Sequence, residues 1–178
     1  MKTVRIFLFA LTLFTVGAIQ AQKVGVRAGL NIANVSGSDV VENKSLIGLH
    51  VGVFKEITIV PEIFFLQPEL QYSMQGYKIE EEDFSLGYFN IPLLGKVYIA
   101  KVLSVEAGPQ IGFKVNDNLE GDLADNIKTF ETSFVGGIGY NFPLGLSINA
   151  RYGLGLTDIV KDSNVKNSVF QIGAAFKF

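Results

Sequence analysis

The chain has 178 residues, of which 48% are hydrophobic and only 18% charged, and its formal net charge is −2 at pH 7. A chain this apolar can bury enough surface to offset the entropy of ordering, so intrinsic disorder is excluded. Because there is no cysteine, a disulfide scaffold, a thiolate zinc site and a cysteine nucleophile are excluded too. The mean hydropathy is +0.33 although no apolar run of helix length follows the N-terminal segment, so the hydrophobic residues must follow another pattern.

The N-terminal segment, residues 1–21, has the layout of a secretory signal peptide. Two basic residues precede an apolar run at 6–16, and small residues follow up to Ala21. We expect cleavage after Ala21, with Ala18 as the alternative position. A short membrane anchor is the competing interpretation, but the run is shorter than the roughly 18 to 20 residues that a spanning helix needs. The predicted mature domain is 22–178.

The rest of the chain shows period-two alternation, which is typical of strands whose two faces meet different surroundings. In one segment, for example, apolar Val105 and Ile111 alternate with polar Glu106 and Gln110. Eight segments alternate in this way: Lys23–Ala33, Leu46–Phe54, Phe64–Met74, Gly87–Ile99, Leu103–Lys114, Thr132–Phe142, Leu144–Leu156 and Ser168–Phe178.

The links between these segments are alternately long and short. The long links are 34–45, 75–86, 115–131 and 157–167, and the short ones include 100–102 and the turn around Pro143. Segments of roughly ten residues match the length of tilted membrane-spanning strands. This layout predicts an all-β fold, an eight-stranded antiparallel up-and-down transmembrane β-barrel of the outer-membrane type. An even strand number places both termini on the short-turn, periplasmic side.

The competing fold is a soluble barrel of the lipocalin type, with its apolar face inside. Glycine favours the membrane barrel, because glycine weakens strands and a solvent-facing surface does not need it. The interior of a narrow eight-stranded barrel needs small residues next to large ones. The polar faces carry Gly25, Gly29, Gly48, Gly52, Gly108, Gly112, Gly137, Gly139, Gly145, Gly153, Gly155 and Gly173. We therefore predict that the polar face lines the lumen and the apolar face meets lipid.

Aromatic residues on the apolar face lie toward the strand ends, as an aromatic girdle requires. The chain also ends on an apolar-face aromatic, Phe178, which resembles the terminal signal of barrel-assembly substrates. The partners we expect are therefore outer-membrane lipid and, through Phe178, the barrel-assembly machinery. Near the long loops lie Tyr72, Phe89, Phe113 and Phe134, and near the short turns Phe142, Phe176 and Phe178.

The four long links are strongly acidic, with thirteen Asp and Glu residues against five lysines. We interpret them as solvated extracellular loops. Binding of calcium or of other bridging cations at Glu80–Asp83 is the alternative.

An ordered set of short motifs resembles the small outer-membrane β-barrel proteins of Bacteroidetes, often labelled porin-family or PorT-like. The resemblance covers essentially all of the mature chain and implies an outer-membrane barrel in a diderm bacterium. It implies no single activity, although a few members are linked to protein secretion. The motifs are Gly25-Val26-Arg27-Ala28-Gly29-Leu30-Asn31, Gln67-Pro68-Glu69-Leu70-Gln71-Tyr72-Ser73 before Gly76, Ile91-Pro92-Leu93-Leu94, Ala107-Gly108-Pro109, Gly136-Gly137-Ile138-Gly139-Tyr140 and Arg151-Tyr152-Gly153-Leu154-Gly155-Leu156-Thr157.

Charged residues on the polar faces form a candidate lumen network. Its members are Arg27, Glu69, Lys96, Glu106 and Arg151, all near the middle of their strands, and Lys177 lies closer to a strand end. A buried unpaired charge costs several kcal/mol. We therefore expect Glu69 and Glu106 each to bridge to one or two of the three central cations. The network is interpreted as a polar plug, with a selectivity filter or gate as the alternative.

His50 is the one imidazole available for general-base chemistry, and it faces inward. Ser36, Asp39 and Ser45 precede it, so an acyltransferase or protease site is conceivable. A lone histidine is more often an interior residue with its hydrogen bonds satisfied, and we expect no catalytic residues.

No glycine-rich phosphate loop, metal-ligand cluster or basic stripe occurs in the sequence, so we expect no cofactor, no metal site and no nucleic-acid partner. The predicted function is that of a monomeric, non-enzymatic outer-membrane barrel with a filled polar lumen and a structural or interaction role. The alternatives are a narrow porin-like channel for solutes or ions and, behind it, the His50 enzyme.

Overall fold

The computed structural model describes residues 23–36, 44–79, 82–100, 102–117, 128–158 and 164–178. The predicted signal peptide, 1–21, lies outside the described residues. In the described ranges, no helix has both the length and the apolar character needed to cross a membrane.

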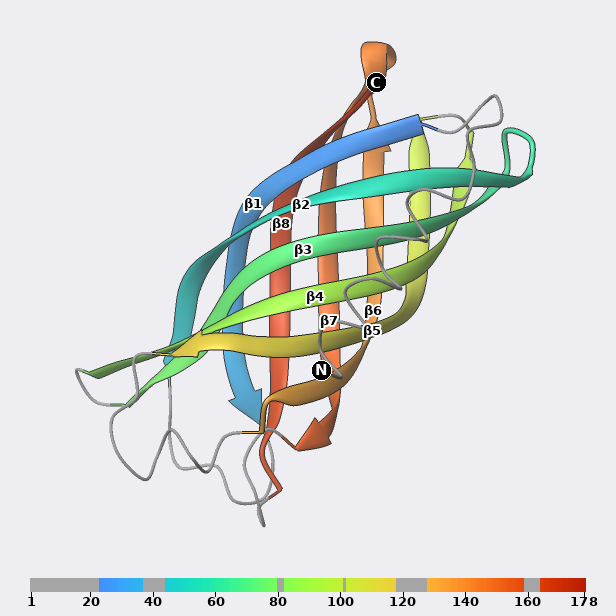
Figure 1. The fold of residues 1–178 in the computed structure, drawn as a ribbon. Helices are drawn as coiled ribbons and strands as arrows, with labels where there is room; N and C mark the ends of the chain where they lie inside the picture. Colours follow the sequence, from blue (N-terminus) through green and yellow to red (C-terminus); the bar gives the residue numbers. More distant parts are fainter. Residues whose placement is uncertain (1–22, 37–43, 80–81, 101, 118–127, 159–163) are drawn as a thin grey trace.

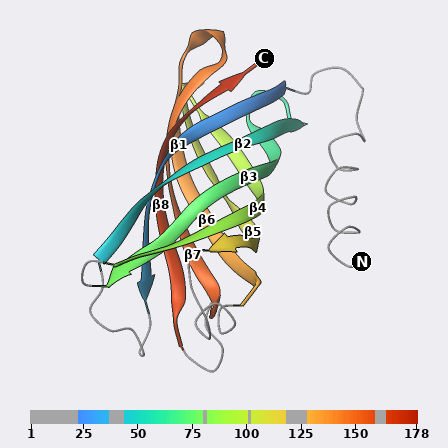
Figure 2. The ribbon, with the colours of Figure 1, turned by 60° about the vertical axis from the view of Figure 1, so that its left-hand side comes forward.

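Eight antiparallel strands form one closed barrel in sequence order, as predicted (Figure 1). Each strand pairs with its neighbours along the chain, and β8 pairs with β1 from Gly25↔Lys177 to Ser36↔Lys166, so the sheet has no free edge (Figure 2). The elements are β1 (Lys23–Ser36), β2 (Lys44–Val60), β3 (Phe64–Ile79), β4 (Glu82–Ile99), β5 (Leu103–Asp117), β6 (Phe130–Asn141), the 3-10 turn η1 (Pro143–Gly145), β7 (Leu146–Asp158) and β8 (Lys166–Lys177).

The two ends of the barrel differ in their connections. At one end lie the start of β1, the end of β8 and the three short turns β2–β3, β4–β5 and β6–β7; we call this the terminal end (upper end of Figure 1). Each short turn contains a residue with positive φ, namely Glu62, Ala100 and Leu144. Such a backbone reverses direction within two or three residues. The opposite end, where β1, β3, β5 and β7 end, is called the loop end.

The apolar side chains face outward and the polar ones inward, which confirms the predicted faces. On β2, for example, the outward Ile47 is 69% exposed, whereas the inward His50 is buried. Asn31 on β1, Gln71 on β3 and Asn90 on β4 are each fully buried in the lumen. A soluble protein would bury the opposite face. The lipocalin-type alternative is therefore wrong.

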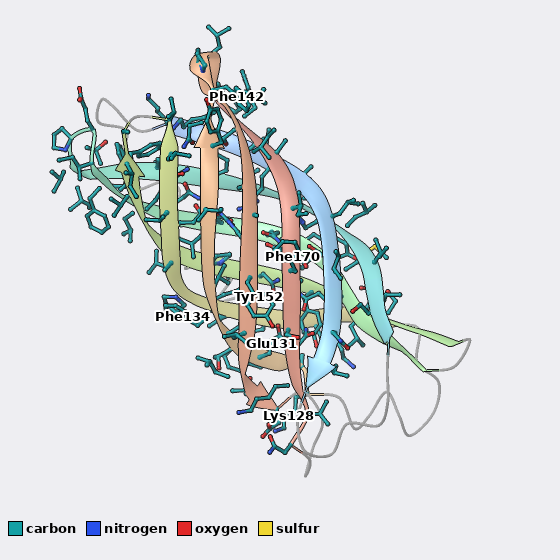
Figure 3. All side chains as sticks on the ribbon, turned by 180° about the vertical axis from the view of Figure 1, so that it is seen from behind. Lys128, Glu131, Phe134, Phe142, Tyr152 and Phe170 are labelled. Carbon is teal, nitrogen blue, oxygen red and sulfur yellow. The ribbon has the colours of Figure 1, made fainter. Side chains whose placement is uncertain are left out.

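Outward aromatic side chains form contacts near both ends of the barrel. At the loop end, Tyr72 and Phe89 have ring centroids 5.6 Å apart. At the terminal end, the Tyr140 and Phe142 centroids are 4.8 Å apart. Figure 3 shows Phe142 beside the β6–β7 turn, and Phe134 farther along the same side of the barrel. This placement agrees with the predicted girdle.

Several strands extend farther than the alternation predicted. The link 75–86, expected to be a long loop, is mostly strand, because β3 continues to Ile79 and β4 begins at Glu82, its register partner. The link after the second segment is also shorter than expected, since β2 continues to Val60. Beyond the membrane both faces of a strand meet water or loops, so pairing can continue where the period-two pattern has ended.

Inward glycines allow close approach between neighbouring strands and side chains. A methyl carbon added at Gly29 would lie 2.2 Å from the Ile172 carbonyl oxygen and 2.8 Å from Cε1 of His50. The same addition at the inward Gly153 would meet its nearest atoms, on Val135 and Val169, at 3.8 Å.

We predict that Gly29→Ala lowers the free energy of unfolding by about 1–3 kcal/mol, because backbone and His50 must move to admit the methyl group. Gly153→Ala, which adds the same atom at another inward position, is the control and should change stability little. Folded fractions at increasing urea, read from the mobility of unheated samples on detergent gels, measure the difference. Equal stability of the two variants would contradict the packing argument.

Candidate functional site

The middle of the lumen is crossed by ion pairs around the Glu69 carboxylate. Glu69, on β3, is fully buried, and its Oε1 and Oε2 accept hydrogen bonds from Arg151 Nη2 and Nη1 at 2.7 and 2.8 Å. Arg27, on β1, reaches the same carboxylate, with Nη1 3.2 Å from Oε2. Because β3 and β7 are not neighbours in the barrel, the Arg151–Glu69 pair spans the interior.

A second carboxylate, that of Glu106, joins the ion pairs around Glu69. Glu106 on β5 accepts a hydrogen bond from Arg151 Nε. Arg27 Nη2 donates to Asn149 Oδ1 at 2.6 Å, and Gln67 Nε2 donates to Glu69 Oε1 at 2.5 Å. We call Arg27, Glu69, Glu106 and Arg151 the central charge layer. Its two guanidinium groups balance its two carboxylates, so the layer is neutral as a unit.

Lys96 does not join this layer, although it is the register partner of Glu106. Its Nζ lies 2.9 Å from Glu56 Oε1, toward the terminal end. The other oxygen of Glu56 accepts from Lys177 Nζ at 2.8 Å, and Tyr98 donates to Glu56 Oε1 at 2.8 Å. Glu56, Lys96, Tyr98 and Lys177 are called the Glu56 cluster.

Glu56 is absent from the predicted lumen network because the predicted second segment ends at Phe54. Glu56 belongs to β2 and is buried in the lumen. The alternation that places His50 and Phe54 inward also places Glu56 inward if it is continued two residues farther. A buried lysine such as Lys96 needs a carboxylate partner, and this requirement is a second signal that points to Glu56.

The prediction that Glu131 lies in an acidic loop is wrong. It lies on β6 (Figure 3) and is buried. With Gln75, Gln110 and Asn167 it lines a small cavity of ≈ 20 Å³. The reason is the strand boundary: β6 begins at Phe130, whereas the predicted segment begins two residues later, at Thr132.

Among the described residues, His50 hydrogen-bonds with an amide, and no serine or carboxylate bonds to it. Its Nδ1 is 2.8 Å from Asn31 Oδ1, and Gln171 Nε2 donates to the same oxygen at 3.0 Å. Within the described ranges its Nε2 has no hydrogen-bond partner. Asp39, one of the residues considered with His50, lies outside the described residues. These contacts fit a histidine packed in the lumen.

The lumen around the central charge layer is filled. The cavity that adjoins Arg27, Glu106 and Arg151 measures ≈ 10 Å³, about the space of one water molecule. A much larger cavity, ≈ 640 Å³, lies between the Glu56 cluster and the terminal end. In the part of the chain that the structure describes, no group of three His, Asp or Glu side chains is placed to hold a metal ion.

A closed barrel with an apolar exterior and a charged interior defines a β-barrel membrane protein. The chain belongs to the outer membrane protein beta-barrel domain family, whose model matches residues 20–161. It is therefore an outer-membrane protein.

Solved structures show the same fold. Neisserial surface protein A has 18% sequence identity, with 87% of this chain and 97% of that chain covered and a TM-score of 0.60. Ail, the attachment invasion locus protein of Yersinia pestis, has 14% identity, with 89% of this chain and 100% of that chain covered and a TM-score of 0.58. None of the curated proteins matches this chain.

We predict that Glu69→Gln lowers the free energy of unfolding by about 3 kcal/mol, because it leaves Arg27 and Arg151 buried with one carboxylate fewer. Adding Arg27→Met should recover part of this loss, since the layer is then neutral again. Urea unfolding of both variants in detergent measures the effect. Glu62→Gln, in the exposed β2–β3 turn, is the control. An additive loss in the double variant would contradict the assigned pairing.

Proposed function

We propose that this protein is a closed, non-enzymatic outer-membrane barrel with a structural or interaction role. The observation that supports this most strongly is the neutral central charge layer, in which Arg151 and Glu69 join opposite walls of the lumen at 2.7 Å. A solute would have to break these pairs and pay for unpaired buried charges. The network Arg27, Glu69, Glu106 and Arg151 is therefore assigned as a plug, while Lys96 acts with Glu56.

The proposed orientation places the terminal end in the periplasm and the loop end outside the cell. Short turns at the terminal end and acidic links at the loop end support it. Even with Glu131 counted as a lumen residue, acidic side chains outnumber lysines in the sequence of the long links. In this orientation Phe178, which directly follows β8, is available to the barrel-assembly machinery, and the outward faces contact outer-membrane lipid.

A finer assignment to the PorT-like barrels of Bacteroidetes is also proposed. It rests on the ordered motifs, three of which include central-layer residues: Arg27 in the first, Glu69 in the second and Arg151 in the last. A role in protein secretion is the interaction function that this resemblance favours. The Asn31 contact of His50 supports a role in packing rather than in catalysis.

We predict that the purified protein gives no steady nanosiemens conductance in planar lipid bilayers, because the lumen is blocked by paired side chains. Glu69→Ser combined with Arg151→Ser removes one charge of each sign and should produce channel openings. The same amount of wild-type protein and of empty detergent are the controls. Steady nanosiemens conductance of the wild type would overturn the closed barrel in favour of the narrow channel.

The orientation can be tested with single cysteines, because the chain has none of its own. Thr129→Cys lies at the loop end near Lys128 (Figure 3), and Leu144→Cys lies in the exposed β6–β7 turn. A membrane-impermeant maleimide should label Thr129→Cys on intact cells, and Leu144→Cys only after the outer membrane is permeabilised. The reverse pattern would show that the proposed orientation is inverted.

A further inference from the structure

The cavity of ≈ 640 Å³ at the terminal end has the size of a small-molecule site. We call it the terminal cavity. It lies between the Glu56 cluster and two short turns, with Glu62 of the β2–β3 turn and Leu144 of the β6–β7 turn among its lining residues. Both of these residues are exposed, so the cavity opens to solvent at that end. On the inner side it ends at the Glu56 cluster, which lies between the cavity and the central charge layer.

The inner wall of the terminal cavity carries an excess of positive charge. Lys96 and Lys177 share one carboxylate, that of Glu56, and both lysines line the cavity. The carboxylates of the central charge layer are already matched by their own two arginines. A half-enclosed pair of ammonium groups with a single carboxylate attracts a further anion, because the pair is shielded from much of the solvent.

The two ammonium groups also retain hydrogen-bonding capacity. Lys177 Nζ donates to Glu56 Oε2 and to Tyr98 Oη, each at 2.8 Å. Lys96 Nζ donates to Glu56 Oε1 at 2.9 Å and to Gln67 Oε1 at 3.3 Å. An ammonium group has three donors, so each keeps one N–H beyond these contacts. A carboxylate with two oxygens can accept from both.

The side walls of the cavity are aromatic. Phe54, Phe65, Tyr98 and Phe142 line it, and the rings of Phe65 and Tyr98 meet edge to face with centroids 5.2 Å apart. An apolar ligand body gains from leaving water against such rings, and an aromatic body gains further from offset or edge contacts.

We propose that the terminal cavity binds a small amphipathic carboxylate, with its carboxylate on Lys96 and Lys177 and its aromatic or short aliphatic body against Phe54 and Phe65. The site opens on the same side as both termini. It does not require a passage through the lumen, so it is independent of whether the barrel conducts. If the carboxylate does not bind, the proposed closed-barrel function is unaffected.

Fluorine NMR with 4-fluorophenylacetate tests the site, using the protein in phosphatidylcholine nanodiscs and empty nanodiscs as the blank. The neutral 4-fluorophenylacetamide is the matched probe, with the same ring and no charge. We expect saturable binding of the carboxylate, about tenfold tighter than that of the amide, because charge-assisted hydrogen bonds are lost with the amide. Equal affinities, or no saturable binding of the carboxylate, would overturn the proposal.

Two substitutions with opposite expected effects on affinity test which residues bind the carboxylate. Lys177→Met should weaken binding of the carboxylate by about tenfold. Glu56→Gln should strengthen it, because the two ammonium groups then lack their carboxylate. Lys166→Met, at the loop end, is the matched control and should bind as the wild type does.

The mobility of unheated samples on detergent gels verifies that each variant is folded. If Glu56→Gln does not fold, the comparison of Lys177→Met with Lys166→Met decides alone. Unchanged affinity of Lys177→Met would overturn the assignment of the carboxylate to this cavity.

Discussion

The pairing of β1 with β8 is the constraint on which the rest of this structure depends. Within a membrane an open sheet edge would leave backbone N–H and C=O groups without water to bond, at a cost of several kcal/mol each. The register from Gly25↔Lys177 to Ser36↔Lys166 removes that edge. Closing only eight strands also makes the lumen so narrow that side chains fill it. The inward glycines and the central charge layer both follow from that width.

A narrow lumen turns charge pairing into a structural requirement. Arginine side chains are long enough to cross it, and Arg151 reaches Glu69 on β3 and Glu106 on β5 with different atoms of one guanidinium group. A planar guanidinium can serve two carboxylates in this way, whereas a lysine offers a single nitrogen. This difference fits the positions of four cations: Arg27 and Arg151 lie in the central charge layer, and Lys96 and Lys177 lie in the Glu56 cluster.

The faces of all eight strands could be predicted from the sequence, because lipid and lumen impose opposite demands on alternate residues. Period two, for example, places Ile47 and Asn31 on opposite faces, and the glycines on the polar face indicate that Ile47 points outward and Asn31 inward. The strand ends could not be predicted in the same way, because the difference between the two faces disappears where the strand leaves the membrane. The assignments of Glu56 and Glu131 to links follow from this one limit. The alternation also does not predict which cation pairs with which carboxylate. Lys96 lies opposite Glu106 in register but pairs with Glu56, two strands away.

The central charge layer divides the lumen into two compartments with different chemistry. On the loop side, Glu131 lies among the neutral side chains Gln75, Gln110 and Asn167 around a cavity of ≈ 20 Å³. On the terminal side, the inner wall of a cavity of ≈ 640 Å³ is the Glu56 cluster, in which two ammonium groups share one carboxylate. Because the layer between them is neutral, it does not compensate the excess charge of either side. The proposed plug and the proposed ligand site therefore use different residues, so blockage of the lumen and ligand binding can be tested separately in one fold.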